Sequence, residues 1–238
     1  MPLQQTVLLH GDSPYRHYYL CNYLPLYVGK DSLSLSLLKF KRGRQPDLNA
    51  WIDCSLEMLG RTDSSIISPG SILLRALHHD ETSVHEDIPT SLDKLGKTLA
   101  DHFQCHYCPY FLRKYLPTQE IKGLNKEQRA AELGNRYYID PRYIPSPSPF
   151  SFLIIDDILT TGTTMQMIIT AMLQSSPEAD LTIFTLAKAD YDNYSNQPTP
   201  FRTYDFYGGP SGNHTVSEEE NYTSSPASLK ARILGDAF

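Results

Sequence analysis

The sequence predicts an α/β fold in which a mostly parallel β-sheet is flanked by helices. A continuous apolar run at residues 152–155 and a mainly apolar run at residues 181–187, which contains two threonines, lack the polar alternation of a half-exposed strand. This pattern is typical of strands buried on both faces. Between them lie four apolar residues at helical spacing: Met165, Ile168, Ile169 and Met172. A strand, a helix and a second strand in this order form a βαβ unit, and the two strands of such a unit are parallel.

The segments before this unit predict further strands and helices. Residues 3–30 combine aromatic and apolar side chains with turn signals, as is typical of short strands in a hairpin or meander. We expect short strands at residues 6–10, 18–23, 26–28, 64–67, 107–112 and 137–139. We expect helices that begin at Asp31 or Ser32, at Leu48, at Ser91 and at Asn125.

The chain is expected to divide into three segments. Residues 1–30 would form a β-rich N-terminal hood, residues 31–188 the α/β core, and residues 189–238 a loosely structured C-terminal extension. The extension is rich in Asn, Ser, Pro and Gly and shows little periodicity. At 238 residues the chain is long enough for one α/β domain with additions or for two small domains.

Composition limits the classes of function. The chain has 27 acidic and 21 basic residues, a net charge of −6, which argues against a nucleic-acid surface spread over the whole protein and leaves a local basic patch open. No segment approaches the roughly 18 consecutive apolar residues of a membrane span, and residues 1–5 lack the features of a secretory signal. We therefore expect a cytoplasmic protein that binds no membrane. A homodimer or a protein partner is compatible with the sequence.

Cysteine and histidine side chains are candidates for a metal site. Cys105 and Cys108 form a CxxC pair, but a zinc site normally needs a second well-spaced pair, and Cys21 and Cys54 are isolated. Buried free thiols are the favoured interpretation, so no zinc is expected. Three histidines lie in the acidic stretch 78–90, namely His78, His79 and His85. They could bind a metal, although the composition of this stretch favours a solvated loop.

The stretch 152–164 carries the strongest functional signal. Its apolar run ends in two carboxylates, Asp156 and Asp157, and a loop of small residues follows: Thr160, Thr161, Gly162, Thr163 and Thr164. Ligands bind at the carboxyl ends of strands in open α/β sheets. The N–H groups of a helix start, the threonine hydroxyls and the glycine suit a phosphate, while the carboxylates suit sugar hydroxyls or a hydrated Mg²⁺. Together these groups indicate a ribose 5-phosphate.

A structural interpretation of the same stretch is a buried strand that ends in a helix cap, with the two aspartates as surface acids. A Walker-type phosphate loop is not indicated, because the loop lacks the lysine that such a motif requires.

Two further segments also have two interpretations. Residues 68–71, Ser-Pro-Gly-Ser, either present backbone N–H groups to an anion or form an ordinary turn. The basic residues at the end of the first helix either neutralise its dipole or line a site for phosphate ligands. These residues are Lys39, Lys41, Arg42 and Arg44.

The four apolar residues, the acidic pair and the Thr-Thr-Gly-Thr-Thr loop resemble the phosphoribosyl pyrophosphate (PRPP) signature of type I phosphoribosyltransferases. This resemblance implies a Rossmann-like phosphoribosyltransferase fold and Mg²⁺ with PRPP as the ligand. It implies that Asp156 and Asp157 bind the ribose and that residues 160–164 bind the 5′-phosphate. It also implies Asp157 as the catalytic proton acceptor. Mg²⁺ would be carried by PRPP without direct protein ligands, with a water bridge to Asp156.

Within this family, the order of segments is similar to that of the ComF-like group. The similar segments are residues 37–44 (LLKFKRGR) and a spaced set that comprises Leu112, Arg113, Thr118, Gln119, Leu124, Arg129, Leu133 and Tyr137. The chain departs from the group in lacking its N-terminal zinc ribbon, in having residues 88–92 in place of an Arg-Gly-Phe-Asn-Gln segment, and in having Glu132 where Asn is usual. The remaining candidates for the pyrophosphate side are Ser68, Gly70, Ser71, Lys39, Arg113 and Lys114.

Two functions follow from the resemblance. The first is an enzyme that transfers phosphoribosyl from PRPP to an unidentified base or amine and releases pyrophosphate. The second is a non-catalytic module that senses PRPP or a nucleotide in the same pocket, in competence, DNA processing or defence. The missing Arg-Gly segment favours the second function.

Overall fold

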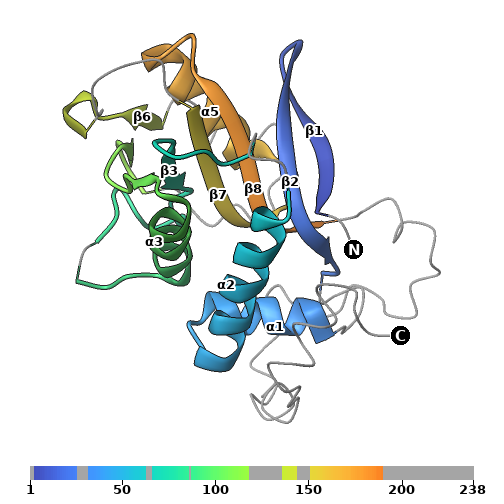
Figure 1. The fold of residues 1–238 in the computed structure, drawn as a ribbon. Coiled ribbons are helices and arrows are strands. Elements are labelled where there is room, and N and C mark those ends of the chain that lie inside the picture. The colour runs from blue at the N-terminus through green and yellow to red at the C-terminus, as the bar shows by residue number, and fades with distance from the viewer. Residues whose placement is uncertain are drawn as a thin grey trace, which may run out of the picture.

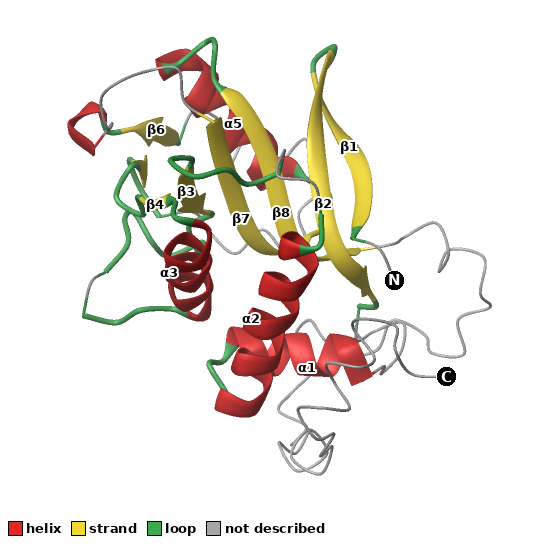
Figure 2. Cartoon of the chain, viewed as in Figure 1, coloured by secondary structure: helices red, strands yellow, loops and turns green. Residues whose placement is uncertain are grey.

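A six-stranded sheet lies at the centre of the computed structural model, which describes residues 3–25, 32–62, 66–85, 87–117, 136–143 and 151–189. In spatial order, its strands are β1 (Gln4–His10), β2 (Ser13–Tyr23), β8 (Asp180–Ala189), β7 (Ser151–Leu159), β3 (Ile72–Arg75) and β4 (His106–Tyr107). All neighbouring strands are parallel except the edge pair of β1 and β2. The predicted α/β class with a mostly parallel sheet is confirmed (Figures 1 and 2).

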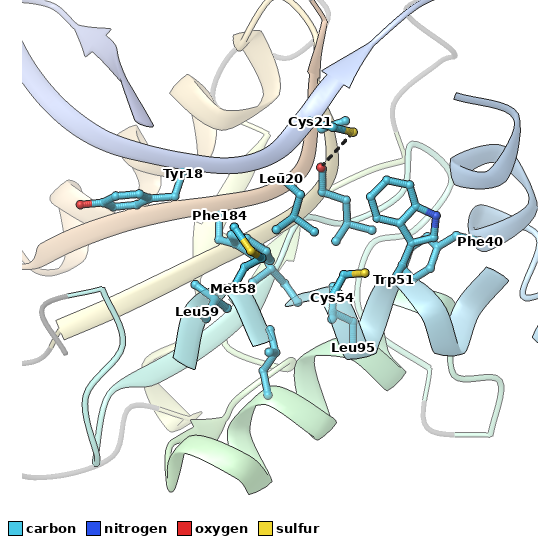
Figure 3. Close-up of a cluster of buried hydrophobic side chains, with 14 of the residues drawn as sticks. Tyr18, Leu20, Cys21, Phe40, Trp51, Cys54, Met58, Leu59, Leu95 and Phe184 are labelled. Carbon is cyan, nitrogen blue, oxygen red and sulfur yellow. Dashed lines mark hydrogen bonds between the residues drawn. The ribbon is translucent and has the colours of Figure 1, made fainter. Parts of the chain in front are cut away.

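Helices cover both faces of the sheet. One face carries α1 (Ser32–Lys41), α2 (Gln45–Gly60) and α3 (Ser91–Phe103), and the other carries α5 (Thr163–Ser175). The first face buries Trp51, Phe40 and Phe184 in one apolar cluster (Figure 3). The second buries the α5 residues predicted to face the core: Met165, Ile168, Ile169 and Met172. Because β7 contributes to both clusters, it is the buried centre of the molecule, as its unbroken apolar run predicts.

A small antiparallel sheet lies beside the carboxyl end of β3. It pairs β5 (Leu112–Lys114) with β6 (Tyr137–Ile139), and a short 3₁₀ helix, η1 (Pro141–Tyr143), follows. The predicted strand 107–112 is therefore divided between β4 and β5. The predicted strand 64–67 lies partly outside the described residues, and its buried Ile66 and Ile67 lie in a bend.

The N-terminal segment, predicted to form a β-rich hood, is joined to the main sheet. Its two strands form a hairpin, but β2 continues the main sheet through seven paired positions with β8, from Arg16 to Tyr23. Tyr18, Leu20 and Cys21 of β2 are therefore core residues of the main sheet. The predicted strand 26–28, the helix at Asn125 and the extension beyond Ala189 lie outside the described residues.

Candidate functional site

The acidic pair, Asp156 and Asp157, lies near the carboxyl end of β7. Successive side chains of a strand point to opposite faces of the sheet. Ile154 belongs to the apolar cluster under α5 and Ile155 to the cluster under α1, α2 and α3. Alternation therefore places Asp156 on the α5 face and Asp157 on the α1 face. The two carboxylates are neighbours in sequence with separate surroundings.

Asp157 is held by an ion pair. Its Oδ2 lies 2.9 Å from Nζ of Lys41, the last residue of α1, and its Oδ1 accepts the N–H of Ile158 at 2.7 Å. Burial alone would lower the pKa of Lys41, but attraction to Asp157, with a smaller effect of Asp156, outweighs burial and raises it. The sequence offered Lys39 as a site residue; the structure buries Lys39 in α1 and brings Lys41 to the acidic pair instead.

Asp156 has fewer partners. Its Oδ1 accepts the N–H of Asp157 at 2.8 Å, and among the described residues its Oδ2 has no hydrogen-bond donor. Burial, and then repulsion from Asp157, raise the pKa of Asp156 to about 7. Asp156 in turn contributes to the raised pKa of the buried Tyr137, whose main cause is burial. This carboxyl group therefore changes its charge near neutral pH, which is unusual for an aspartate.

The threonine loop forms a short connection between β7 and α5. Thr160 and Thr161 are exposed, and Gly162 is the buried N-cap residue of α5 with a φ of 75°. In this left-handed conformation a side chain is strained. The Thr161 and Thr163 hydroxyl oxygens lie 3.0 Å apart. Because the first N–H groups of an α-helix have no partners within the helix, this connection presents donors beside the acidic pair, where a phosphate would be stabilised.

The structure does not bring Ser68, Gly70 and Ser71 to this site. They precede β3, whose Ile72 pairs with Phe152 and whose Arg75 pairs with Ile155. Ser71 therefore lies at the amino end of the sheet, about 17 Å from the level of Asp156 at about 3.3 Å per residue. Sequence reasoning placed this loop after a strand at residues 64–67, but the strand follows the loop. The prediction that Ser68, Gly70 and Ser71 lie on the pyrophosphate side of the site therefore does not fit this geometry.

Residues 76–81, which follow β3, lie at the carboxyl end of the strand and near the acidic pair. The N–H of Ala76 donates to the carbonyl of Ile155 at 2.9 Å, so the chain leaves the sheet beside Asp156. Lys114, a predicted site residue, packs against this segment and donates to the carbonyl oxygens of His78 and His79. Burial is the main cause that lowers the pKa of Lys114 to about 8.

The other basic candidate is turned away from the acidic pair. Arg113 precedes Lys114 in β5, so the two side chains leave opposite faces of the small sheet. Arg113 Nε lies 3.2 Å from Oδ2 of Asp140 as an ion pair without hydrogen-bond geometry, and its guanidinium lies over the ring of Tyr143. Asp140 and Tyr143 are thus the partners of Arg113.

Sequence reasoning missed a buried ionic network at the base of residues 76–81. Arg75, with its side chain only 2% exposed, donates to both carboxylate oxygens of Glu81 at 2.7 Å and pairs with Asp93 of α3. Tyr107 donates to Asp93 at 2.7 Å. The available signal was an arginine at the end of an apolar run with acids a few residues later, a pattern that indicates a buried pair.

A shallow groove lies elsewhere, between the ends of α2 and α3, and is lined by Asp53, Leu56, Glu57, Gly60 and His102. Because α3 runs back from β3 to the start of β4, its last residues lie at the amino edge of the sheet. The groove is therefore separate from the acidic pair. No helix in the described part of the chain is long and apolar enough to cross a membrane. All four cysteines are free thiols.

Comparison with protein-family models and with curated proteins finds no match. Among solved structures, the chain is similar to an adenine phosphoribosyltransferase from Saccharomyces cerevisiae, at 17% identity over 63% of this chain and 73% of that one, with a TM-score of 0.37. It is similar to a hypoxanthine phosphoribosyltransferase from Staphylococcus aureus, at 18% identity, 59% and 64% coverage and a TM-score of 0.35. It is also similar to an adenine phosphoribosyl transferase from Trypanosoma brucei, at 11% identity over 92% of this chain and 99% of that one, with a TM-score of 0.40. Similarity at this level identifies neither a ligand nor an activity.

Proposed function

We propose that the chain binds PRPP and transfers its phosphoribosyl group to a base or amine acceptor, with release of pyrophosphate. The observation that carries this proposal is the juxtaposition of two unlike carboxylates at the carboxyl end of β7 with the start of α5, whose N-cap Gly162 is five residues after Asp157. Hydroxyl acceptors beside phosphate donors at this spacing match a ribose 5-phosphate.

In this proposal the α5 end of the site holds the 5′-phosphate through residues 160–164, and Asp156 and Asp157 accept hydrogen bonds from the ribose hydroxyls. Mg²⁺ would arrive with PRPP and neutralise the leaving pyrophosphate. Asp156 suits a water-bridged Mg²⁺, because its Oδ2 has no donor among the described residues. Apart from proton transfer, the chain's own part in the reaction is to orient the ribose and exclude alternative poses.

The sequence assigned the role of proton acceptor to Asp157, and the surroundings of the pair favour a different division of work. Asp157 is engaged by Lys41 at 2.9 Å, which fixes its orientation for the ribose. Asp156 has a pKa of about 7 and is therefore the better proton acceptor from an incoming nucleophile near neutral pH. On this proposal, Asp156→Asn lowers turnover more than Asp157→Asn at saturating PRPP; equal losses would contradict it.

A second candidate function, the non-catalytic sensor, rests on the engagement of the basic candidates. Lys114 donates to backbone carbonyls, Arg113 forms an ion pair with Asp140, and Lys39 is buried. A site in which these cations are engaged would bind PRPP without lowering the barrier to pyrophosphate departure. Membership of the ComF-like group is proposed from the sequence segments alone.

The deciding experiment is calorimetric titration of PRPP with Mg²⁺ into the wild-type chain and into Asp156→Asn/Asp157→Asn. Micromolar binding that falls at least about a hundredfold in the variant is expected, since each lost charge-assisted hydrogen bond costs about 1.5–3 kcal/mol. The matched control is Asp53→Asn/Asp101→Asn, which removes two exposed acids at the opposite edge. No binding by folded wild type would refute both functions. Pyrophosphate release across a panel of bases and amines separates the enzyme from the sensor.

A further inference from the structure

Three side chains with metal-ligating atoms meet in the segment that follows β3. The ligand atoms of His78, His79 and Asp80 all lie within 4.8 Å of one another. The two imidazole rings are 4.1 Å apart between centroids, and His78 Nδ1 is 2.5 Å from Oδ1 of Asp80. The ligands of a tetrahedral site with bonds near 2.1 Å are about 3.4 Å apart, so small side-chain rotations suffice to close this set around an ion.

The backbone beneath these side chains is held in place by other residues. The N–H of His78 donates to Glu81, which is itself held by both terminal nitrogens of the buried Arg75. The carbonyl of His78 accepts from Lys114 Nζ and from the N–H of Glu81. The N–H of Lys114 donates to the carbonyl of Thr82 at 2.8 Å. A metal at His78 and its neighbours would therefore meet ligands on an ordered support, which reduces the entropic cost of binding.

The charge around this segment also favours a cation. Asp80 and Glu81 are acidic, and the cation closest to Glu81, Arg75, is consumed by Glu81 and Asp93. The basic candidates for the pyrophosphate side, Lys114 and Arg113, are engaged as well. A diphosphate approaching this edge of the sheet would meet acidic side chains unless a cation were bound there.

We propose that His78, His79 and Asp80 bind a first-row divalent transition metal, Zn²⁺ in the first instance, at the carboxyl end of β3. Two imidazoles and one carboxylate are ligands that Zn²⁺ accepts readily, and three protein ligands leave a coordination position open. Resting on the proposed function, the open position takes an oxygen of the diphosphate of PRPP. The metal thereby supplies the positive charge that the engaged basic residues do not.

The test is calorimetric titration of Zn²⁺ alone into the metal-free full chain, kept reduced. We expect one ion per chain with a micromolar or tighter dissociation constant, weakened at least about tenfold in His78→Ala/His79→Ala and in Asp80→Asn. These substitutions retain the backbone groups that hold the segment. The matched control is His85→Ala, an exposed histidine of the same segment, which should leave affinity unchanged. Cobalt substitution should show no thiolate-to-metal absorption.

Absence of zinc binding, or binding that the double variant and Asp80→Asn retain in full, overturns the metal site. The diphosphate step is tested separately by titrating PRPP with and without Zn²⁺. The step is supported if Zn²⁺ tightens PRPP binding in the wild type and not in the metal-site variants. It is refuted if the wild type binds PRPP with equal affinity with and without Zn²⁺. If Zn²⁺ binds as expected while PRPP binds under neither condition, the proposed function fails and the metal site stands.

Discussion

Two strand-to-helix connections leave the same edge of the sheet, and they differ in what they do with their polar groups. The connection from β7 to α5 takes three residues, 160–162, and its two threonines are exposed. The connection from β3 to α3 runs from residue 76 to residue 90, and its polar groups bond to one another through Arg75, Glu81 and Lys114.

This difference separates a ligand site from its support. Donors in the β7 connection are directed outward by a helix start, so they are available to an anion at little cost in reorganisation. In the β3 connection, charges are buried, where each must be paired. His78 and Asp80 are exposed on its outside, and their ligand atoms cluster with that of the half-buried His79. The comparison predicts large losses of stability in the second connection and losses of ligand affinity in the first.

The largest effect is expected for Arg75→Met. Removing this guanidinium leaves Glu81 and Asp93 without their main partner in a buried position, which should lower the free energy of unfolding by about 3–5 kcal/mol. Urea denaturation followed by circular dichroism measures the loss. The matched control is Arg61→Met, whose exposed pair with Glu57 should contribute less than about 0.5 kcal/mol. Similar small losses in both variants would remove the structural role assigned to the β3 connection.

A smaller effect is expected for Gly162→Ala. The φ of 75° disfavours a Cβ by about 1–2 kcal/mol, and the new atom would lie 2.8 Å from Cδ1 of Leu8, a side chain that can move. Unfolding free energy should fall by about that amount and PRPP affinity should fall with it. Gly60→Ala, at a glycine with open space around it, should cost less. If Leu8→Ala restores the loss completely, contact rather than backbone conformation is the cause.

The β7 connection could be predicted from the sequence because all of its parts are contiguous. An apolar run, two acids and a small-residue loop determine a strand, its end and a helix start without knowledge of the remaining chain. Helices α1 and α3 were predictable for the same reason, because each shows its own periodicity and start signal. The periodicity also predicted α2, but its start was placed at Leu48, three residues late, because its N-cap residue Arg44 makes no side-chain cap. Strand alternation predicts that the two aspartates lie on opposite faces of the sheet, while the face of each is known from the packing of Ile154 and Ile155.

The β3 connection could not be predicted, since its structure depends on residues far apart in the chain. β3 has four residues, too few to show a period, and its position was inferred one segment too early. This error moved Ser68 and its neighbours to the wrong edge. The pairing of Lys41 with Asp157 spans more than a hundred residues, and nothing in the basic run 39–44 distinguishes Lys41 from Lys39 before the helix is packed.

The smallest effect concerns the charge of Asp156. An ionised carboxylate accepts hydrogen bonds from ribose hydroxyls better than a protonated one, and the pKa of Asp156 is about 7. PRPP affinity should therefore rise about tenfold, or about 1.4 kcal/mol, from pH 6 to pH 8, because the ionised fraction rises by that factor. Burial raises this pKa in the folded state above the ordinary aspartate value of about 4. The contribution of Asp156 to the free energy of unfolding is therefore greatest below about pH 4 and is lost as the pH rises from there through about 7.

Calorimetry at several pH values measures this dependence, and Asp156→Asn is its control. PRPP carries phosphates that titrate near pH 6, and the variant retains that contribution while it lacks the carboxyl group. A wild-type slope that exceeds the slope of the variant assigns the difference to Asp156. Identical slopes would mean that Asp156 is ionised throughout, and the two carboxylates of β7 would then be equivalent acceptors for the ribose. In that case the separate surroundings of the pair, Lys41 on one side and a donor-free oxygen on the other, would set orientation alone.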